Sequence, residues 1–412
     1  MGVTITLIRH GETAANHGHI WQGQGDSALT AAGREQAAAL GRRFEGADPG
    51  LVVASNLGRT LATAGFAGLD AEADPEWREM DIGAWEGMTR TEVLERYPEE
   101  LAALRRGEPV RMGGGETWSE FGGRIARAFD ALVGRLADGE HATVVTHGGV
   151  IHSVVSAVLT HGGRGRPWPM DRVRNTALAV VSADHRGRRL VTYNDDRHAR
   201  TAPHPDETGP IVTLVRHGES EANLDGRWQG RTDGALTERG LLQGAELAAL
   251  LDGATHVYSS PLRRAADTAR AFAAVAGLEV ATVDDLVEID FGAWEDMTPS
   301  DARRADPDLW HRVYDHGEDL PRGRTGERYA DAAVRIERAV VAAAAGGPDR
   351  HPVLFTHGGA LRAFLASIVG LDHAHRRRLT MPGNASASRV RLSDAGAVVT
   401  SFNVGGGRPA VA

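Results

Sequence analysis

The chain contains one pattern twice: a short apolar, β-branched run followed at once by Arg-His-Gly-Glu. The first copy follows residues 3–8 and the second follows residues 211–215. Further pairs separated by 205 to 210 residues extend the duplication along the whole chain: His10 and His217, Arg59 and Arg264, Glu79 and Glu288, Trp85 and Trp294, His147 and His357, Asn175 and Asn384. A repeat this long is a duplicated domain, because solenoid units have periods of roughly 20–50 residues.

Composition is consistent with two ordinary soluble domains. Each half of the 412 residues is long enough to bury a full core, and the hydrophobic share of 42% and charged share of 25% are typical of globular proteins. The absence of cysteine excludes disulfides, thiolate metal sites and cysteine nucleophiles. The net charge of −9 argues against a nucleic-acid partner. No apolar run approaches the roughly 18 residues of a membrane span, and no signal-peptide pattern is present, so we expect a cytoplasmic protein without a membrane partner.

Each half alternates strand-like and helix-like segments, which favours a layered α/β fold. We predict strands at 4–8, 51–55 and 141–146, helices at 30–44, 59–67 and 150–159, and a terminal hairpin of 177–182 with 189–193. The second half repeats this plan, with strands at 254–259, 352–356 and 388–392. We expect a first domain over 1–200, a linker rich in Pro, His, Asp and Thr over 201–210, and a second domain over 211–412.

Two motifs place arginine and histidine where an anion could bind. The glycine after His10 or His217 lets the backbone approach a ligand, and a following helix would point its N–H groups at an anion. Residues 55–60 and 260–265 open helices whose first turn carries Arg59 or Arg264, which can offer a planar fork to phosphate oxygens. Taken alone, each motif fits equally a surface turn or a solvated helix residue.

Two further motifs supply acids and a second histidine. Residues 78–87 and 287–296 each carry two or more acids around Gly-Ala-Trp-Glu, and we expect Asp81 and Glu86 to bond backbone N–H groups. The second histidine, His147 or His357, follows a buried strand and precedes Gly-Gly, and a lone histidine there can be structural. Ligands bind at the carboxyl ends of parallel strands, so the recurrence of all these groups in both halves favours an oxyanion pocket.

This set of residues resembles the histidine phosphatase superfamily, also called the phosphoglycerate mutase-like family, over nearly the whole chain, twice. The resemblance implies two three-layer α/β/α sandwich domains, each with a mostly parallel central sheet. One departure is Gly58, where the family usually has a bulkier residue, and we expect a looser helix start there. The roles implied by the resemblance are nucleophiles that become phosphohistidines at His10 and His217, phosphate-pocket residues at Arg9, Arg59, His147, Arg216, Arg264 and His357, a further phosphate contact at Asn16 and Asn223, and general acids at Glu79 and Glu288.

The function expected is hydrolysis of small-metabolite phosphomonoesters, with an acidic-to-neutral pH optimum and a phosphorylated metabolite as the partner. One alternative is a cofactor-dependent phosphomutase, and another is one catalytic domain beside a phosphate-binding regulatory domain. We expect no cofactor and no divalent metal, because arginines supply the positive charge. The isolated histidines lack a paired metal-ligand spacing and are expected to be solvated or packed: His17, His19, His152 and His161.

Substrate specificity is predicted to lie in the segment between the acid loop (residues 78–87 or 287–296) and the next Gly-Glu. This segment differs between the halves, so they are expected to prefer different substrates; the alternative is a pair of cap helices with solvated arginines. Glu116 and Glu327 are expected to orient the pocket from its rim. The residues concerned are 88–115 with Arg105, Arg106 and Arg111, and 297–326 with Trp310, His311, Arg312 and Tyr314.

Overall fold

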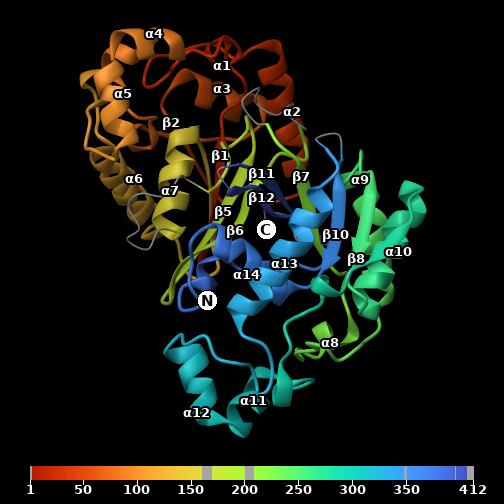
Figure 1. The fold of residues 1–412 in the computed structure, drawn as a ribbon. Helices are drawn as coiled ribbons and strands as arrows, with labels where there is room; N and C mark the ends of the chain where they lie inside the picture. The colour runs from red at the N-terminus through yellow and green to blue at the C-terminus, as the bar shows by residue number, and fades with distance from the viewer. Residues whose placement is uncertain (1, 160–168, 200–207, 348–349, 395, 406–412) are drawn as a thin grey trace. The chain divides into compact units, whose positions relative to one another are not determined.

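The computed structural model describes residues 2–159, 169–199, 208–347, 350–394 and 396–405, in two compact units (Figure 1). The first unit contains 2–159 and 172–199, and the second contains 169–171 and the described residues from 208 onward. His161, most of the predicted linker and the chain end from residue 406 lie outside the described residues. Within the described ranges, no helix has the length and apolar character needed to cross a membrane.

The strands of the first unit follow the order β3-β2-β4-β1-β5-β6. Strands β3, β2, β4 and β1 are parallel, whereas β5 pairs antiparallel with β1 and forms a hairpin with β6. Arg9 of β1 is paired in register with Thr146 of β4, so His10 and His147 leave neighbouring strands at the same sheet edge. The strand bounds are β1 Val3–Arg9, β2 Leu51–Ser55, β3 Glu72–Asp74, β4 His141–Thr146, β5 Leu178–Asp184 and β6 Gly187–Asp195.

The second unit repeats this plan in the order β9-β8-β10-β7-β11-β12. Arg216 of β7 is paired with Thr356 of β10, which again brings two histidines, His217 and His357, to adjacent strand ends. The terminal hairpin of β11 and β12 is antiparallel, with β11 beside β7. The strand bounds are β7 Ile211–Arg216, β8 His256–Ser259, β9 Val280–Thr282, β10 Pro352–Thr356, β11 Ser386–Ser393 and β12 Gly396–Gly405.

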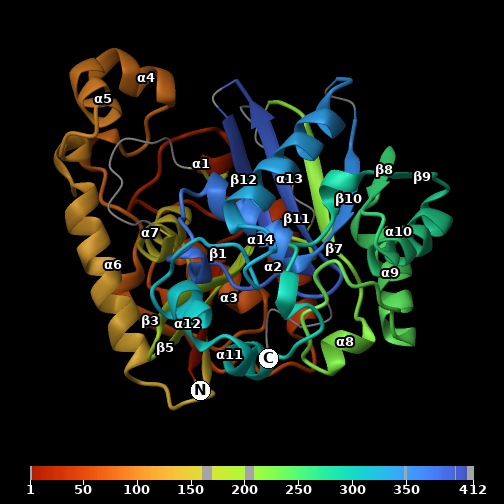
Figure 2. The same cartoon turned by 60° about the horizontal axis from the view of Figure 1, so that its bottom comes forward.

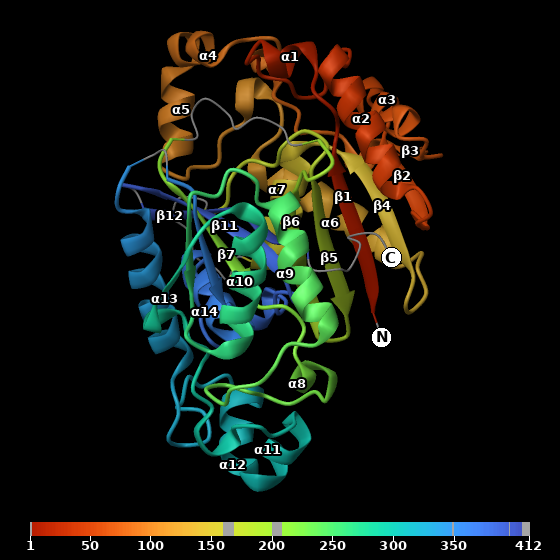
Figure 3. The same ribbon diagram turned by 90° about the vertical axis from the view of Figure 1, so that its right-hand side faces the viewer.

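Helices cover both faces of each sheet, as the three-layer prediction requires. In the first unit α2 (Ala31–Phe44) and α3 (Gly58–Phe66) lie side by side on one face (Figure 3). Leu40 and Phe44 of α2 pack there with Ile8 and Val145. Successive strand side chains point to opposite faces, so the buried neighbours of these strand residues pack against the other helix layer, α6 (Trp118–Val133) and α7 (Gly148–Leu159).

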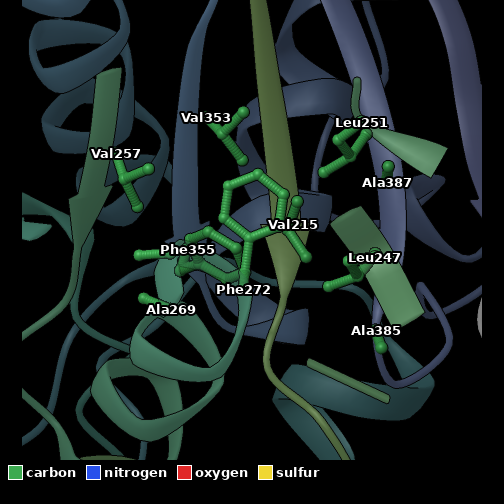
Figure 4. Packing of buried hydrophobic residues seen from close by; sticks show 11 residues of the cluster. Val215, Leu247, Leu251, Val257, Ala269, Phe272, Val353, Phe355, Ala385 and Ala387 are labelled. Carbon is green, nitrogen blue, oxygen red and sulfur yellow. The ribbon is translucent and has the colours of Figure 1, made fainter. Parts of the chain in front are cut away.

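The second unit is layered in the same way. Helices α9 (Glu238–Leu250) and α10 (Arg263–Ala276) run side by side in both Figure 2 and Figure 3, while α13 (Tyr329–Ala344) pairs with α14 (Gly358–Ile368). Figure 4 shows Phe272 of α10 against Phe355, in the same cluster as Leu247 of α9 and Leu251, which directly follows α9. Thr30 and Thr237 each accept the N–H of the third residue of the following helix, which is why α2 and α9 begin where they do.

Short helices occupy the two segments predicted to set specificity. Segment 88–115 forms α4 (Arg90–Arg96) and α5 (Pro98–Arg105), and segment 297–326 forms α11 (Pro299–Ala305) and α12 (Pro307–Trp310) (Figure 1). A further short helix follows each first motif, α1 (Ala14–His17) and α8 (Glu221–Leu224). The main predicted strands and helices are all present, with α7 beginning two residues earlier than expected.

Candidate active site

His10 is buried immediately after β1, and its hydrogen bond fixes its tautomer. The ring Nδ1 lies 2.7 Å from the carbonyl oxygen of Gly11. A carbonyl only accepts, so Nδ1 carries the proton and Nε2 keeps its lone pair. Burial, followed by the charges of Arg59 and Arg9, lowers the pKa of His10 well below its ordinary value. The ring is therefore neutral at neutral pH, the form in which an imidazole can attack phosphorus.

His217 has the same arrangement in the second unit. Its Nδ1 lies 2.7 Å from the Gly218 carbonyl oxygen, and burial, with Arg216 and Arg264, lowers its pKa well below the ordinary value. The glycine is required by close packing, because a Cβ on Gly218 would lie 2.3 Å from the Gly240 carbonyl oxygen. The N–H of Gly218 donates to Thr268 Oγ1 at 2.9 Å, which ties this loop to α10.

The second histidine of each unit faces the first. The ring centroids of His10 and His147 are 5.3 Å apart, and those of His217 and His357 are 5.2 Å apart. In the first unit Arg59 Nε donates to His147 Nδ1 at 3.2 Å, so the His147 Nε2–H donates to Ser55 Oγ at 2.9 Å. In the second unit His357 Nε2 lies 2.8 Å from Ser260 Oγ, and its buried Nδ1 has no protein partner among the described residues.

Two arginines per unit bring positive charge to these rings. Arg9 and Arg216 are the last residues of their strands, and each NH1 donates at 2.7 Å to a backbone carbonyl, of Val173 or Pro382. Their buried Nε atoms have no protein acceptor in the described part of the chain. Burial is the main cause that lowers the pKa of both guanidiniums to about 10, so both remain charged at neutral pH.

Arg59, the second residue of α3, holds the loop that contains Gly23 and Gly25. Its NH1 and NH2 donate to the carbonyls of Gly25 and Gly23 at 2.7 and 2.6 Å. Arg264 does the same with Thr232 and Gly230, at 2.9 and 2.8 Å.

We expected Gly58 to loosen the start of α3, and this expectation was wrong. The Asp26 carboxylate accepts the Gly58 N–H at 2.8 Å and so caps the helix from a separate loop. A Cβ at this position would lie 2.2 Å from Asp26 Oδ2. The small residue therefore makes room for the cap that fixes Arg59.

Glu79 and Glu288 are held by the helix that follows the second histidine. The Gly149 N–H donates to Glu79 Oε2 at 2.9 Å, and Met80 N–H donates to Oε1. Burial raises the pKa of Glu79, against the opposing effect of these backbone donors and of Arg59. Glu288 accepts from Ile289, Gly359 and Ala360 at 2.7–2.9 Å.

The more distal acids are loop carboxylates, as expected. Glu86 accepts the N–H groups of Gly23 and Gly25, and Asp81 accepts the N–H of Gly83. Glu86 thereby fixes the same loop whose carbonyls Arg59 binds. Both acids therefore bind backbone N–H groups, the role that the sequence predicts for them.

Asn16 and Asn223 are joined to the loops that carry His10 and His217 through a second asparagine. The amide of Asn175 donates to the His10 carbonyl at 3.0 Å and to Asn16 Oδ1 at 3.1 Å. Asn384 makes the equivalent bonds to His217 and Asn223, at 3.2 and 2.8 Å. Sequence reasoning paired Asn175 with Asn384 only as markers of the repeat, and their equal spacing was the signal that could have assigned them to the site.

An arginine that sequence reasoning missed supports each acid loop. Arg124 of α6 forms a fork with Glu116, at 2.8 and 3.0 Å, and donates to the carbonyls of Arg78 and Glu79. Arg335 makes the equivalent fork with Glu327 and donates to the Val287 carbonyl. Each arginine follows its glutamate by eight residues in both halves, and that repeated spacing could have identified it. Each glutamate is thus joined, through its arginine, to the backbone of the segment that carries Glu79 or Glu288.

The two segments predicted to set specificity are built differently. Arg105, Arg106 and Arg111 are exposed, and Arg106 and Arg111 pair with Glu108 and Glu120. In the second unit His311 and Arg312 are exposed, whereas Trp310 and Tyr314 pack with ring centroids 4.3 Å apart. Of the three arginines of the first segment, Arg105 ends α5, whereas Arg106 and Arg111 lie outside α4 and α5.

The pocket's positive charge comes from guanidinium groups. Among the described residues, no group of three or more His, Asp or Glu side chains is arranged to hold a metal ion. Each site brings together two imidazoles, two guanidiniums and a carboxyl, a set of groups that suits binding of a phosphoryl group and its transfer to nitrogen.

Comparison with known proteins identifies the family. The model of the histidine phosphatase superfamily (branch 1) matches residues 5–196 and again residues 212–405. The chain belongs to this superfamily. The two histidine phosphatase repeats correspond to the two halves found in the sequence, and the mostly parallel α/β sheets are those of this fold.

Individual members of the superfamily align with a single repeat. Probable phosphoglycerate mutase GpmB of Enterobacter sp. (strain 638) is 33% identical over 43% of this chain and 83% of its own length. The solved mycobacterial glucosyl-3-phosphoglycerate phosphatase is 29% identical over 48% of this chain and all of its own, with a TM-score of 0.44. Phosphoserine phosphatase of Entamoeba histolytica is 29% identical over 48% of this chain and 98% of its own, with a TM-score of 0.43.

Proposed function

We propose that this histidine phosphatase hydrolyses phosphomonoesters of small metabolites through a phosphohistidine, in each of two domains spanning 1–200 and 211–412. The observation that carries the proposal is the hydrogen bond from His10 Nδ1–H to the Gly11 carbonyl, repeated by His217 and Gly218. It leaves a neutral Nε2 lone pair on a buried ring that lies among guanidinium groups.

In the first step His10 Nε2 attacks phosphorus, and the bond from phosphorus to the leaving ester oxygen breaks. Charge on the three equatorial oxygens is met by Arg9, Arg59 and the side-chain amide of Asn16. Glu79 starts protonated, which its raised pKa favours, and gives its proton to the leaving oxygen. The products of this step are the alcohol and a phosphohistidine.

In the second step water attacks phosphorus and the bond to His10 Nε2 breaks. Glu79, now ionised, accepts the proton of that water and returns to its starting form. His147 accepts from Arg59 and donates to Ser55, so it aligns the arginine in the free enzyme. In the second domain His217, Glu288, Arg216, Arg264 and Asn223 take the corresponding roles. His357 lies against Ser260, as His147 lies against Ser55, but its Nδ1 has no partner among the described residues.

The test is product analysis over a panel of phosphorylated metabolites, with His10→Ala and His217→Ala chains assayed separately. We expect free phosphate from both single variants and none from the double variant. Isomerised phosphoester formed faster than free phosphate would contradict hydrolysis in favour of a phosphomutase.

The regulatory alternative is separated by the same panel. One single variant would then lose all turnover, while the silent domain still binds a phosphate ester at equilibrium. Retention of activity by both single variants is the result that two catalytic domains require.

A further inference from the structure

The residues proposed to bind the phosphate are equivalent in the two domains, but three equivalent positions near them carry different residues. His152 and Arg362 each follow the second histidine by five residues. Trp118 and Tyr329 are the first residues of α6 and α13. The N–H groups of Met112 and Arg322 donate to the carbonyls of Glu116 and Glu327, both at 3.3 Å. An apolar set in the first domain thus corresponds to two arginines and a tyrosine in the second.

The second domain builds a cluster of positive charge from these positions. Arg362 Nε donates to the Tyr329 hydroxyl at 3.1 Å. Arg322 is buried, donates to His373 Nε2 at 2.7 Å and lies 3.6 Å from the Asp319 carboxylate. That carboxylate also accepts the N–H groups of Tyr329 and Ala330, so it serves as a helix cap as well.

Arg376 adds a third guanidinium, from the short 3-10 helix Arg376–Arg378. It is only 3% exposed and lies 5.5 Å from the ring centre of Tyr314 and 5.7 Å from that of Tyr329. Within the described ranges, neither Arg362 nor Arg376 forms an ion pair with a carboxylate. Burial, together with Arg362, lowers the pKa of Arg376 to about 9, so the group is still charged at neutral pH.

Arg362 links this cluster to the phosphate pocket. It lies on α14, whose first residues hold Glu288, and its charge adds to the burial that lowers the pKa of Arg216. Arg376 lies in the connection that leads to Pro382 and Asn384. The Pro382 carbonyl accepts a hydrogen bond from Arg216, and the Asn384 amide donates one to the His217 carbonyl. The cluster therefore adjoins the phosphate-binding groups.

The three equivalent positions in the first domain carry no arginine. Met112 is buried, and Trp118 is 45% exposed and packs against His152 with ring centroids 5.6 Å apart. Burial lowers the pKa of His152 to about 4, so its ring is neutral. Arg172, which is exposed, directly precedes Val173. The equivalent residue of the second domain is Met381, which directly precedes Pro382. Among the described residues of the first domain, these equivalent positions hold no buried arginine.

Like charges held together away from water destabilise one another, and an anion bound among them removes that cost. Guanidinium groups bind carboxylates and phosphates through paired N–H donors. We propose that the second domain binds phosphomonoesters carrying a second anionic group, and that Arg322, Arg362 and Arg376 receive that group. This inference rests on the proposed function, because it assumes that the ester phosphate lies at His217.

The test compares 3-phosphoglycerate with glycerol 3-phosphate, which differ by a carboxylate in place of a hydroxymethyl group. The full chain carrying His10→Ala reports turnover by the second domain alone. We expect a higher kcat/KM for 3-phosphoglycerate, and Arg362→Met should reduce the ratio of the two values roughly tenfold, the size of one charge-assisted hydrogen bond. Arg362→Lys should restore part of the ratio.

The control is Arg270→Met, which removes an exposed arginine of α10 and should leave the ratio unchanged. An unchanged ratio in Arg362→Met, with both esters still hydrolysed, would overturn the inference and leave the proposed function standing. If neither ester is hydrolysed, calorimetric binding decides: selective loss of 3-phosphoglycerate affinity in Arg362→Met supports the subsite, and equal affinity in both chains refutes it. Replacing the carboxylate by a second phosphate in the probe distinguishes which anion is preferred.

Discussion

Gly149 and Glu79 are fitted so closely that a Cβ on the glycine would lie 2.2 Å from Glu79 Oε1. The Gly149 N–H also donates to Glu79 Oε2 at 2.9 Å. Gly359 and Glu288 repeat the relationship, with a Cβ distance of 2.7 Å. The Gly-Gly after the second histidine therefore positions the proposed acid as well as beginning the helix.

Gly149→Ala is predicted to displace the Glu79 carboxyl while leaving the arginines and His10 in place. In a His217→Ala chain, kcat for an alkyl phosphate should fall by about 10²-fold, the lower range for losing general acid catalysis. Inhibition by inorganic phosphate should change little. Gly148→Ala is the matched control, because a Cβ there would lie 3.5 Å from Arg9 Nε, an ordinary contact.

The first domain is predicted to lose activity on the alkaline side as Glu79 ionises. Burial raises the pKa of Glu79 above 4.5, so the proton needed for the leaving oxygen persists above that pH and is lost as pH rises through the raised value. The pKa of His10 is lowered below 6.5, so the nucleophile stays neutral well into the acidic range. Steady-state kcat/KM against pH in the His217→Ala chain should therefore peak at acidic-to-neutral pH.

Glu79→Gln identifies the group responsible for that alkaline decline. The variant should lose the decline and should be slowed much more on an alkyl phosphate than on p-nitrophenyl phosphate, whose leaving group needs no proton. Equal slowing on both substrates would show that Glu79 does not act as the acid.

Arg124→Met is predicted to act through Glu79. The variant loses the hydrogen bonds that Arg124 donates to the carbonyls of Arg78 and Glu79. The acid loop is then held less firmly, so kcat should fall by roughly tenfold with a smaller change in KM. Arg124→Lys should recover part of the loss, and Arg127→Met on the same helix serves as the control. A change confined to thermal stability would mean that the Glu116 fork is only structural.

Asn175→Ala removes the donor shared by the His10 carbonyl and Asn16 Oδ1. Leaving these acceptors without their partner should destabilise the first domain by about 1–3 kcal/mol. Chemical denaturation measures this, and KM for a phosphate ester should rise because Asn16 is no longer held. An unchanged free energy of unfolding and unchanged KM would contradict the assignment of Asn175 to the site.

The site could be predicted from sequence where local pattern and strand register agree. His10 and His147 each follow an apolar run, and two adjacent parallel strands end at the same edge. The hairpin of β5 and β6 could also be predicted from the sequence. Its place beside β1 was not, because the pairing of Leu178 with Ile8 joins segments 170 residues apart that carry no local signal for each other.

The arginines show the limit of the sequence most clearly. Arg105, Arg106 and Arg111 drew attention because they crowd one segment, yet they are exposed. Arg322, Arg362 and Arg376 of the second domain are separated by up to 54 residues in the sequence, and each looks like a solvated residue in its own segment. Only tertiary packing brings them together.

The most direct test of the central claim is to trap phosphoenzyme with a phosphate ester and locate the modified atoms by mass spectrometry and ³¹P NMR. The account predicts acid-labile phosphate on Nε2 of His10 and His217 in the wild-type chain, on one of them in each single alanine variant, and on neither in the double variant. Phosphate on another residue, or an adduct that survives in the double variant, would contradict it.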